Sequence, residues 1–256
     1  MKITTTNVLT SAPTITTGGG STDDPANLID QDFATSFQSS NTTQLIASFG
    51  AVGTINYVAV AGMNIEGSKN YTSEVRTYDG ATLITRVFVK TNQPVVMAFD
   101  AQSFSNLRIY LYNPSGTKPI ARYMAAGTLL EIPNSGEQSG YVRQHLVANY
   151  KNRATLNAQS EPTSIVRKRI QSKGKLSIPN VTRSFSENEW QLFVNFALTD
   201  MFFILERDAE TDATTGNNIA PAAYIGYDID KVNVTAHSQT RALNNISLSF
   251  KVTNGL

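Results

Sequence analysis

The chain contains no cysteine among its 256 residues. That absence excludes a disulfide framework, a thiolate metal site and a cysteine nucleophile, so stability must come from packing and assembly. No apolar run approaches the roughly 20 residues needed to span a bilayer, and Met1 to Thr6 lack the apolar centre of a signal peptide. We therefore expect synthesis in a cytoplasm and no membrane insertion.

An excess of charge of one sign is also absent. The chain carries 21 Lys and Arg against 20 Asp and Glu, a formal net charge of +1. Bulk charge therefore gives no reason to expect binding to nucleic acid or to an anionic membrane surface.

Motifs of catalysis are missing as well. His145 and His237 lie in separate segments without metal-ligand spacing, and no nucleophile elbow or dinucleotide fingerprint is present. Gly18 to Ser21 lacks the helix and lysine of a phosphate loop. We expect no enzyme and no catalytic residue.

Short β-branched and aromatic runs, each bounded by Gly, Asn, Asp or Pro, fill the first half. Their spacing predicts an antiparallel sandwich. Leu107–Tyr112 alternates between apolar and polar residues, which predicts a half-buried strand, and Asp79-Gly80 predicts a hairpin turn. The expected strands are Gln44–Phe49, Thr54–Ala61, Ser73–Tyr78, Ile84–Lys90, Val95–Phe99 and Leu107–Tyr112.

The segment Ala26–Phe37, with sequence ANLIDQDFATSF, combines buried apolar anchors with a carboxylate-lined turn. It resembles the opening motif of discoidin-like, galactose-binding-like β-sandwiches, Ala-x-x-Ile-Asp-Gly-Asp-x-x-Thr-x-Trp. Gln31 replaces the glycine of that motif and Phe37 replaces the tryptophan. The resemblance implies a discoidin-like jelly-roll sandwich over about the first 127 residues.

Asp30 and Asp32 admit two interpretations. Hard oxygen ligands clustered in a turn suit Ca²⁺, and the resemblance implies a structural calcium near this motif. The alternative is an Asx-type turn that needs no ion. An acid/base pair is disfavoured because neighbours in one turn seldom flank a substrate.

Glycan binding by the first half would need aromatic rings and polar groups at the loop end of the sandwich. The candidate contacts are Phe33, Phe37, Tyr71 and Arg76, with Tyr78 and Asn70 also available. Ordinary core or surface use is the alternative for each.

The Pro- and Gly-containing stretch Glu131–Glu137 predicts a join between two domains, 1–130 and 131–256. In the second, Ser186-Glu187-Asn188-Glu189 predicts a capping box that starts a helix at about 186–198. Trp190, Phe193, Val194 and Ala197 give this helix an apolar stripe, and Met201–Glu206 predicts an apolar strand beneath it. The expected fold class is all-β in two β-rich domains, the second a β-sandwich or barrel with one flanking helix.

Charge separates sharply within the second half. Residues 140–183 hold nine basic residues against one acid, whereas residues 184–256 hold nine acids against four basic residues. Blocks of opposite sign permit head-to-tail docking of identical subunits into a ring, although they can equally neutralise each other within one barrel. The candidate ring-interface residues are Arg143, Arg153, Arg167, Lys168 and Arg169 on one side and Asp208, Glu210 and Asp212 on the other.

The order of parts in the second half resembles tail proteins of tailed bacteriophages. The resemblance rests on Thr182–Trp190, Phe196–Glu206, the late Tyr227 and the terminal strand Asn245–Val252. It implies a distal-tail or minor tail protein of the virion tail tip or baseplate. Such a protein forms a homo-oligomeric ring, commonly a hexamer, with tail tube and tail hub proteins as neighbours. DNA would pass through the lumen without specific binding, past an acidic lining of Asp208, Glu210 and Asp212.

Three functions are therefore open. A structural virion protein, with the first domain contacting host glycans, predicts stable rings. A free carbohydrate-binding module predicts a monomer with affinity for sugar, and an accessory domain of a glycan-active enzyme predicts a separate catalytic chain.

Overall fold

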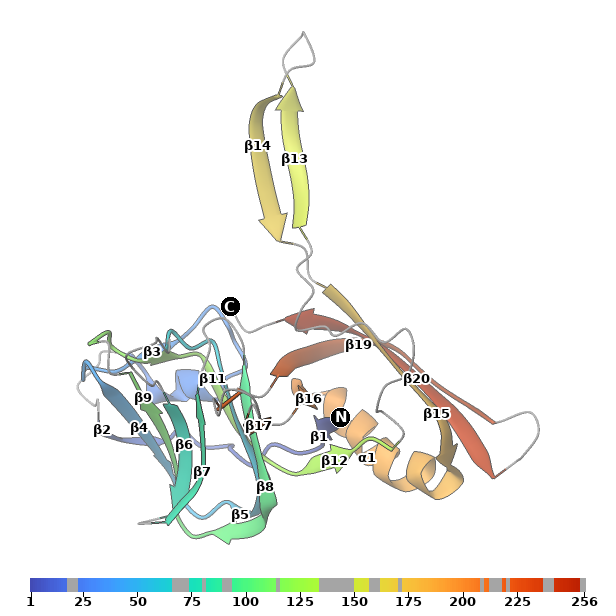
Figure 1. Cartoon of the computed structure of the whole chain (residues 1–256), viewed down its shortest axis with the longest axis horizontal. Coiled ribbons are helices and arrows are strands. Elements are labelled where there is room, and N and C mark those ends of the chain that lie inside the picture. Colours follow the sequence, from blue (N-terminus) through green and yellow to red (C-terminus); the bar gives the residue numbers. More distant parts are fainter. Residues whose placement is uncertain are drawn as a thin grey trace.

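The computed structural model confirms an all-β chain with one short helix (Figure 1). It describes residues 1–17, 23–65, 74–79, 82–88, 94–113, 116–133, 150–156, 162–169, 172–207, 210–211, 218–219, 222–236 and 242–253. Within these ranges, no helix is long and apolar enough to cross a membrane.

The first half forms a sandwich of two antiparallel sheets. The outer sheet has five strands in the order β2-β4-β9-β6-β7, and the inner sheet has three in the order β11-β5-β8. The strands are β2 (Thr14–Thr17), β4 (Gln44–Phe49), β5 (Gly53–Ala61), β6 (Glu74–Asp79), β7 (Thr82–Phe88), β8 (Val95–Phe104), β9 (Leu107–Tyr112) and β11 (Tyr123–Gly127). A short pair, β3 (Phe37–Gln38) with β10 (Ile120–Ala121), and a 3-10 turn, Pro25–Leu28, complete this half.

The local patterns predicted these strands well. β4 and β9 begin and end where expected, and burial alternates along β9 with Leu107, Ile109 and Leu111 inside. β6 pairs antiparallel with β7 up to Asp79 opposite Thr82, which confirms the hairpin. The alternation of apolar and polar residues predicts these strands because one face of each outer strand packs on the core and the other faces solvent.

A six-stranded sheet in the order β12-β1-β16-β19-β20-β15 dominates the second half. Its strands are β12 (Leu129–Glu131), β1 (Lys2–Thr4), β16 (Phe202–Arg207), β19 (Ala222–Ala236), β20 (Leu243–Thr253) and β15 (Ser172–Thr182). β1 lies between β12 and β16, with Ile3 opposite Leu130 on one side and Ile204 on the other. Strand pairing thus crosses the expected boundary at residue 130, while the two-domain division itself stays a prediction.

The six-stranded sheet is buried on both faces along β16. Phe202 and Ile204 pack toward helix α1 (Trp190–Ala197), together with Trp190 and Phe193. The intervening Phe203 and Leu205 point the other way, into a cluster with residues of β5 and β11. Helix, six-stranded sheet, inner sheet and outer sheet therefore form four layers, and the described strands close no barrel.

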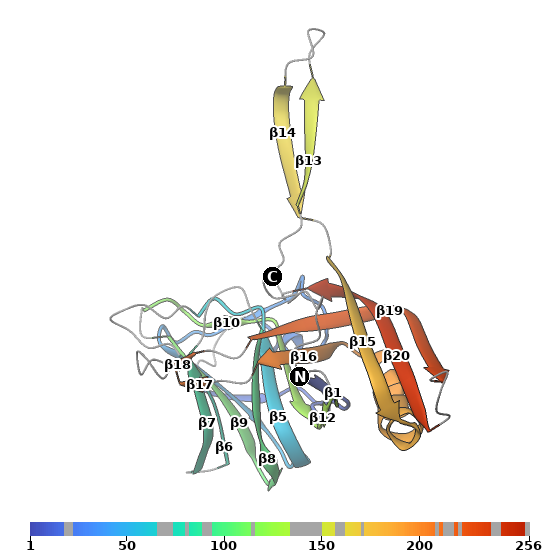
Figure 2. The ribbon, with the colours of Figure 1, turned by 45° about the vertical axis from the view of Figure 1, so that its right-hand side comes forward.

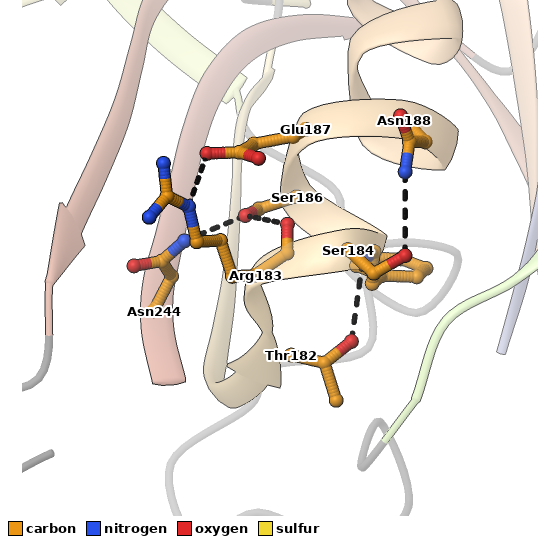
Figure 3. Close-up of polar contacts among 8 residues, drawn as sticks. Thr182, Arg183, Ser184, Ser186, Glu187, Asn188 and Asn244 are labelled. Atoms are coloured by element: carbon orange, nitrogen blue, oxygen red, sulfur yellow. Dashed lines mark hydrogen bonds and ion pairs between the residues drawn. The ribbon is translucent and has the colours of Figure 1, made fainter. Parts of the chain in front are cut away.

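The helix starts earlier than predicted. Helical structure runs from Arg183, passes through a π-helical segment at Phe185–Glu189 and continues as α1. The hydroxyl of Thr182 accepts a hydrogen bond from the backbone N–H of Phe185 at 3.2 Å, so Thr182 takes the capping position (Figure 3). The predicted capping box at Ser186 was wrong. Ser186 is buried, donates to the carbonyl of Arg183 and accepts from Nδ2 of Asn244 on β20 at 2.6 Å.

Two hairpins extend from the second half. β13 (Tyr150–Leu156) pairs with β14 (Pro162–Arg169), and β17 (Glu210–Thr211) pairs with β18 (Asn218–Ile219). The β13–β14 hairpin, hereafter the ribbon, stands away from the four layers in both views (Figures 1 and 2).

Candidate functional site

The carboxylates of Asp30 and Asp32 organise the turn that carries them. Oδ1 of Asp30 accepts from the N–H of Asp32 at 2.9 Å, and its Oδ2 accepts from the hydroxyl of Thr35 at 2.8 Å. Oδ1 of Asp32 accepts from the N–H of Ala34 at 2.8 Å. These are the contacts of an Asx-type turn. No group of three or more His, Cys, Asp or Glu that could hold a metal occurs in the described part of the chain. The calcium site stays a prediction.

Gln31, between these two aspartates, joins the two halves of the molecule. Its Nε2 donates to Oδ1 of Asp200 at 2.8 Å, and its Oε1 accepts from the N–H of Met201 at 2.9 Å. Its φ is +59°, in the left-handed region that favours glycine. The motif that this segment resembles has glycine at this position. The sequence analysis noted that Gln31 replaces the glycine but did not predict its hydrogen bonds to Asp200 and Met201.

A polar cavity of about 260 Å³ opens at this junction, lined by Gln31, residues 197–201 and residues 227–229. Burial raises the pKa of Tyr227, while the nearby Lys251 lowers it and Asp228 raises it. Asp228, which lines the cavity, forms an ion pair with Lys251. Asp200 accepts a hydrogen bond from Gln31, and Asp228 is paired with Lys251. We therefore interpret this cavity as part of the contact between the two halves rather than as a ligand site.

The structure describes the side chains of only two of the four predicted glycan contacts, Phe33 and Phe37. Phe37 is only 2% exposed and belongs to the sandwich core, so the prediction of a glycan contact there was wrong. Phe33 is half-buried, edge-on to Tyr123 at 6.1 Å between ring centroids, and its carbonyl accepts from Nη1 of Arg122. Tyr71 and Asn70 lie outside the described residues, and Arg76 and Tyr78 are placed only as backbone positions on β6.

A different aromatic group lies on the open face of the outer sheet. Tyr110 and Tyr112 of β9 are half-buried, and their rings are nearly parallel, with an interplanar angle of 14° and centroids 6.1 Å apart. The hydroxyl of Tyr110 donates to Oε1 of Gln44 at 3.1 Å. We call Tyr110, Tyr112 and Gln44, with Arg108 two residues before Tyr110 on β9, the tyrosine patch.

Strand register places the members of the patch side by side. On β4, Gln44 lies opposite Tyr112 and Ser48 lies opposite Arg108. Residues opposite each other in an antiparallel pair share a face, and successive residues alternate between faces. Since Leu107, Ile109 and Leu111 fill the core, Arg108, Tyr110 and Tyr112 point outward.

The loop before β4 holds one end of the patch rigid. Oδ1 of Asn41 accepts from the N–H of Thr43 at 2.8 Å, from the hydroxyl of Thr43 at 3.0 Å and from the N–H of Gln44 at 3.1 Å. The N–H of Asn113, directly after β9, donates to the carbonyl of Thr43 at 2.7 Å. The ends of β4 and β9 are thus locked together beside Tyr112. Sequence reasoning found the outward face of β9 but assigned no function to it.

The structure describes no side chain of the residues predicted for a ring interface. Arg153, Arg167, Lys168 and Arg169 are backbone positions on the ribbon, and Glu210 is one on β17. Arg143, Asp208 and Asp212 lie outside the described residues, as do His145 and His237. The ring and the acidic lumen lining therefore remain predictions.

Comparison with known proteins finds likeness only among solved structures. No family model matches the chain, and no curated protein matches it. A GH29 fucosidase of Ruminococcus gnavus in complex with fucose aligns with 49% of this chain and 27% of its own, at 14% identity and a TM-score of 0.39. The chain thus spans about a quarter of that enzyme.

Two carbohydrate-binding modules are similar over nearly their whole length. Chitosan-binding module 1 of the chitosanase/glucanase from Paenibacillus sp. IK-5 aligns with 47% of this chain and 98% of its own, at 12% identity and a TM-score of 0.37. The CBM32 of AlyQ in complex with 4,5-unsaturated mannuronic acid aligns with 47% and 97%, at 23% identity and a TM-score of 0.35. At these scores the likeness carries no argument about function, which must rest on the site itself.

Proposed function

We propose that this chain is a non-catalytic carbohydrate-binding protein that holds a saccharide at the tyrosine patch. The observation that carries the proposal is the pair of nearly parallel, half-buried rings of Tyr110 and Tyr112 on an open sheet face. Aromatic rings at a protein surface offer apolar area to the C–H groups of a sugar.

Polar neighbours complete the patch. Gln44 adds an amide group and Arg108 adds a guanidinium group beside the two rings. A saccharide carries many hydroxyls, each of which must exchange its bonds to water for bonds to protein. A site that combines aromatic surface with a few oriented polar groups meets both requirements.

The strand that carries the tyrosine patch is held on both sides, which favours binding of a saccharide there. Both tyrosines sit on β9, which is paired with β4 on one side and with β6 on the other. The locked loop at Asn41 fixes the end of β4 as well. A preorganised site loses little conformational entropy when the ligand binds, which raises affinity without new contacts.

The test is calorimetric titration of the full chain with oligosaccharides chosen from a glycan screen. We expect Tyr112→Ala to weaken binding at least tenfold, and Tyr110→Phe to weaken it less because the ring remains. Tyr227→Ala, at a half-buried tyrosine of the other half, is the matched control and should bind as the wild type does. Unchanged affinity in a Tyr110→Ala, Tyr112→Ala double variant would refute the proposal.

A structural role in a phage tail tip is the second candidate. The observation that favours it is the protruding ribbon, a feature suited to contacts between subunits (Figure 2). In that setting the sandwich would decorate the virion tail and contact a host glycan. Light scattering on the purified chain tests the ring directly, and localisation of the chain in virions would test the tail position.

A further inference from the structure

The ribbon is an unusual element because the described residues leave it as two strands alone. β13 and β14 pair only with each other in the sheet topology. An isolated two-stranded hairpin is marginally stable in water, since neither face is covered. In its register Lys151 lies directly opposite Lys168, a like-charge pairing that weakens it further. A stable ribbon therefore needs a surface to cover it.

The sequence of the ribbon specifies the chemistry of that surface. Five basic residues and no acid lie in the half nearest the body, at Lys151, Arg153, Arg167, Lys168 and Arg169. The other half, residues 154–156 and 162–166, carries no charge and contains Leu156, Ile165 and Val166. A purely anionic polymer would match only the basic half of the ribbon. A protein surface with carboxylates beside exposed apolar side chains matches both.

Exposed groups of this kind occur along helix α1 and at its two ends. Leu192 and Leu198 are 66% and 67% exposed, the most exposed large apolar side chains among the described residues. Glu187 and Glu189 are exposed at the start of the same helix. Glu187 pairs with Arg183, yet residues 183–200 still hold three carboxylates against that one arginine. Exposed leucines and exposed carboxylates in one helical segment supply both kinds of group that match the sequence of the ribbon.

We infer that the ribbon of one copy of this chain docks on helix α1 of a second copy. Both views place the ribbon away from α1 of its own chain, so the contact joins two molecules (Figures 1 and 2). The apolar half of the ribbon covers Leu192 and Leu198, and its basic half faces Glu187 and Glu189. Because the two surfaces differ, the contact is heterologous and builds a ring or a filament.

The experiment is sedimentation velocity on the full chain at high micromolar concentration. The salt concentrations are about 0.1 M and about 1 M, where the Debye length is about 10 Å and about 3 Å. We expect species at multiples of the 27.9 kDa monomer mass at low salt and fewer of them at high salt. Leu192→Ser with Leu198→Ser should give monomers. Val234→Ser, at a valine that is 47% exposed on β19, should not.

Charge reversal distinguishes this contact from any other self-association. Arg167→Glu with Lys168→Glu and Arg169→Glu should give monomers, and so should Glu187→Lys with Glu189→Lys. An equimolar mixture of these two variants should associate again, because each supplies the surface that the other lacks. A wild-type chain that stays monomeric at both salt concentrations would overturn the inference. Association that survives the leucine substitutions would overturn it too.

Discussion

At the scale of single residues, Gln31 shows how one side chain can join two halves of a molecule. It occupies a left-handed backbone conformation, with φ of +59°, and bonds to Asp200 and to the backbone of Met201. A non-glycine residue in this conformation costs about 1–2 kcal/mol. The two hydrogen bonds offset that cost, one of them to a charged group worth about 1.5–3 kcal/mol.

Two substitutions of Gln31 distinguish the cost of its left-handed backbone from the contribution of its two hydrogen bonds. Gln31→Ala removes both bonds and keeps the strain, so we expect a loss of about 2–3 kcal/mol in the free energy of unfolding. Gln31→Gly removes the same bonds but relieves the strain, and should be about 1 kcal/mol more stable than the alanine variant. Urea denaturation measures both. Equal stability of the two variants would show that the left-handed backbone carries no strain.

Tyr57 and Tyr123 also act at the residue scale, in the core between the sandwich and the six-stranded sheet. Burial raises the pKa of Tyr57, and its hydroxyl donates to the carbonyl of Thr6 at 2.7 Å. Burial, and then the charge of Asp200, raise the pKa of Tyr123 as well. The folded chain therefore retains protons that the unfolded chain releases above its pKa of about 10.

Stability should consequently fall as pH rises above about 10, because the unfolded state then binds fewer protons than the folded state. Urea denaturation across this range measures the slope. Tyr57→Phe should lower the slope, because it removes one of the two buried phenols. A wild-type stability that is flat above pH 10 would contradict the burial of these phenols.

At the scale of elements, the start of helix α1 depends on the strand before it. Thr182 is both the last residue of β15 and the cap of the helical segment, so strand and helix join without a loop. Ser186 is then free to bond Asn244 on β20, which ties the helix to the sheet. The capping pattern read from the sequence located a helix start correctly within three residues but chose the wrong hydroxyl. Thr182, Ser184 and Ser186 are all residue types that can cap a helix, and packing selects one of them.

Removing the cap should cost more than removing a neighbouring hydroxyl. Thr182→Ala should lower the free energy of unfolding by about 1 kcal/mol, which shifts the melting temperature by about 2–4 °C in a chain of this size. Ser184→Ala, at an exposed hydroxyl that accepts from Asn188, should change it by less than about 0.5 kcal/mol. Thermal melting followed by circular dichroism compares the two. A larger loss of stability for Ser184→Ala than for Thr182→Ala would assign the cap to Ser184.

At the scale of the whole molecule, the sandwich and the six-stranded sheet share one core. Phe203 of β16 is 1% exposed and stacks on Tyr123 of β11, with centroids 5.9 Å apart and an interplanar angle of 5°. β1 and β12 enter the sheet from the first half of the chain. Elements that bury so much apolar surface together are expected to unfold together.

Two probes test that cooperativity. Trp190, the sole tryptophan, reports on the helix and its sheet, and far-ultraviolet circular dichroism reports on all strands. The two melting curves of the wild type should coincide. Phe203→Ala should lower both together, with a loss of about 3–5 kcal/mol, and Phe99→Ala, at a half-buried ring, should cost less. A separate transition of Trp190 would show two independent domains.

Sequence alone determined the all-β class, the bounds of β4 and β9, the hairpin at Asp79 and the existence of one helix with a buried Trp190. These features depend on neighbours within a few residues, whose periodicity records which face is buried. Tertiary structure alone decided the rest. It placed β1 beside β16, buried Phe37, gave Gln31 its partners 169 and 170 residues away, and aligned Tyr112 with Gln44. Those relations depend on how strands from distant parts of the chain pair and stack, and no local pattern encodes that choice.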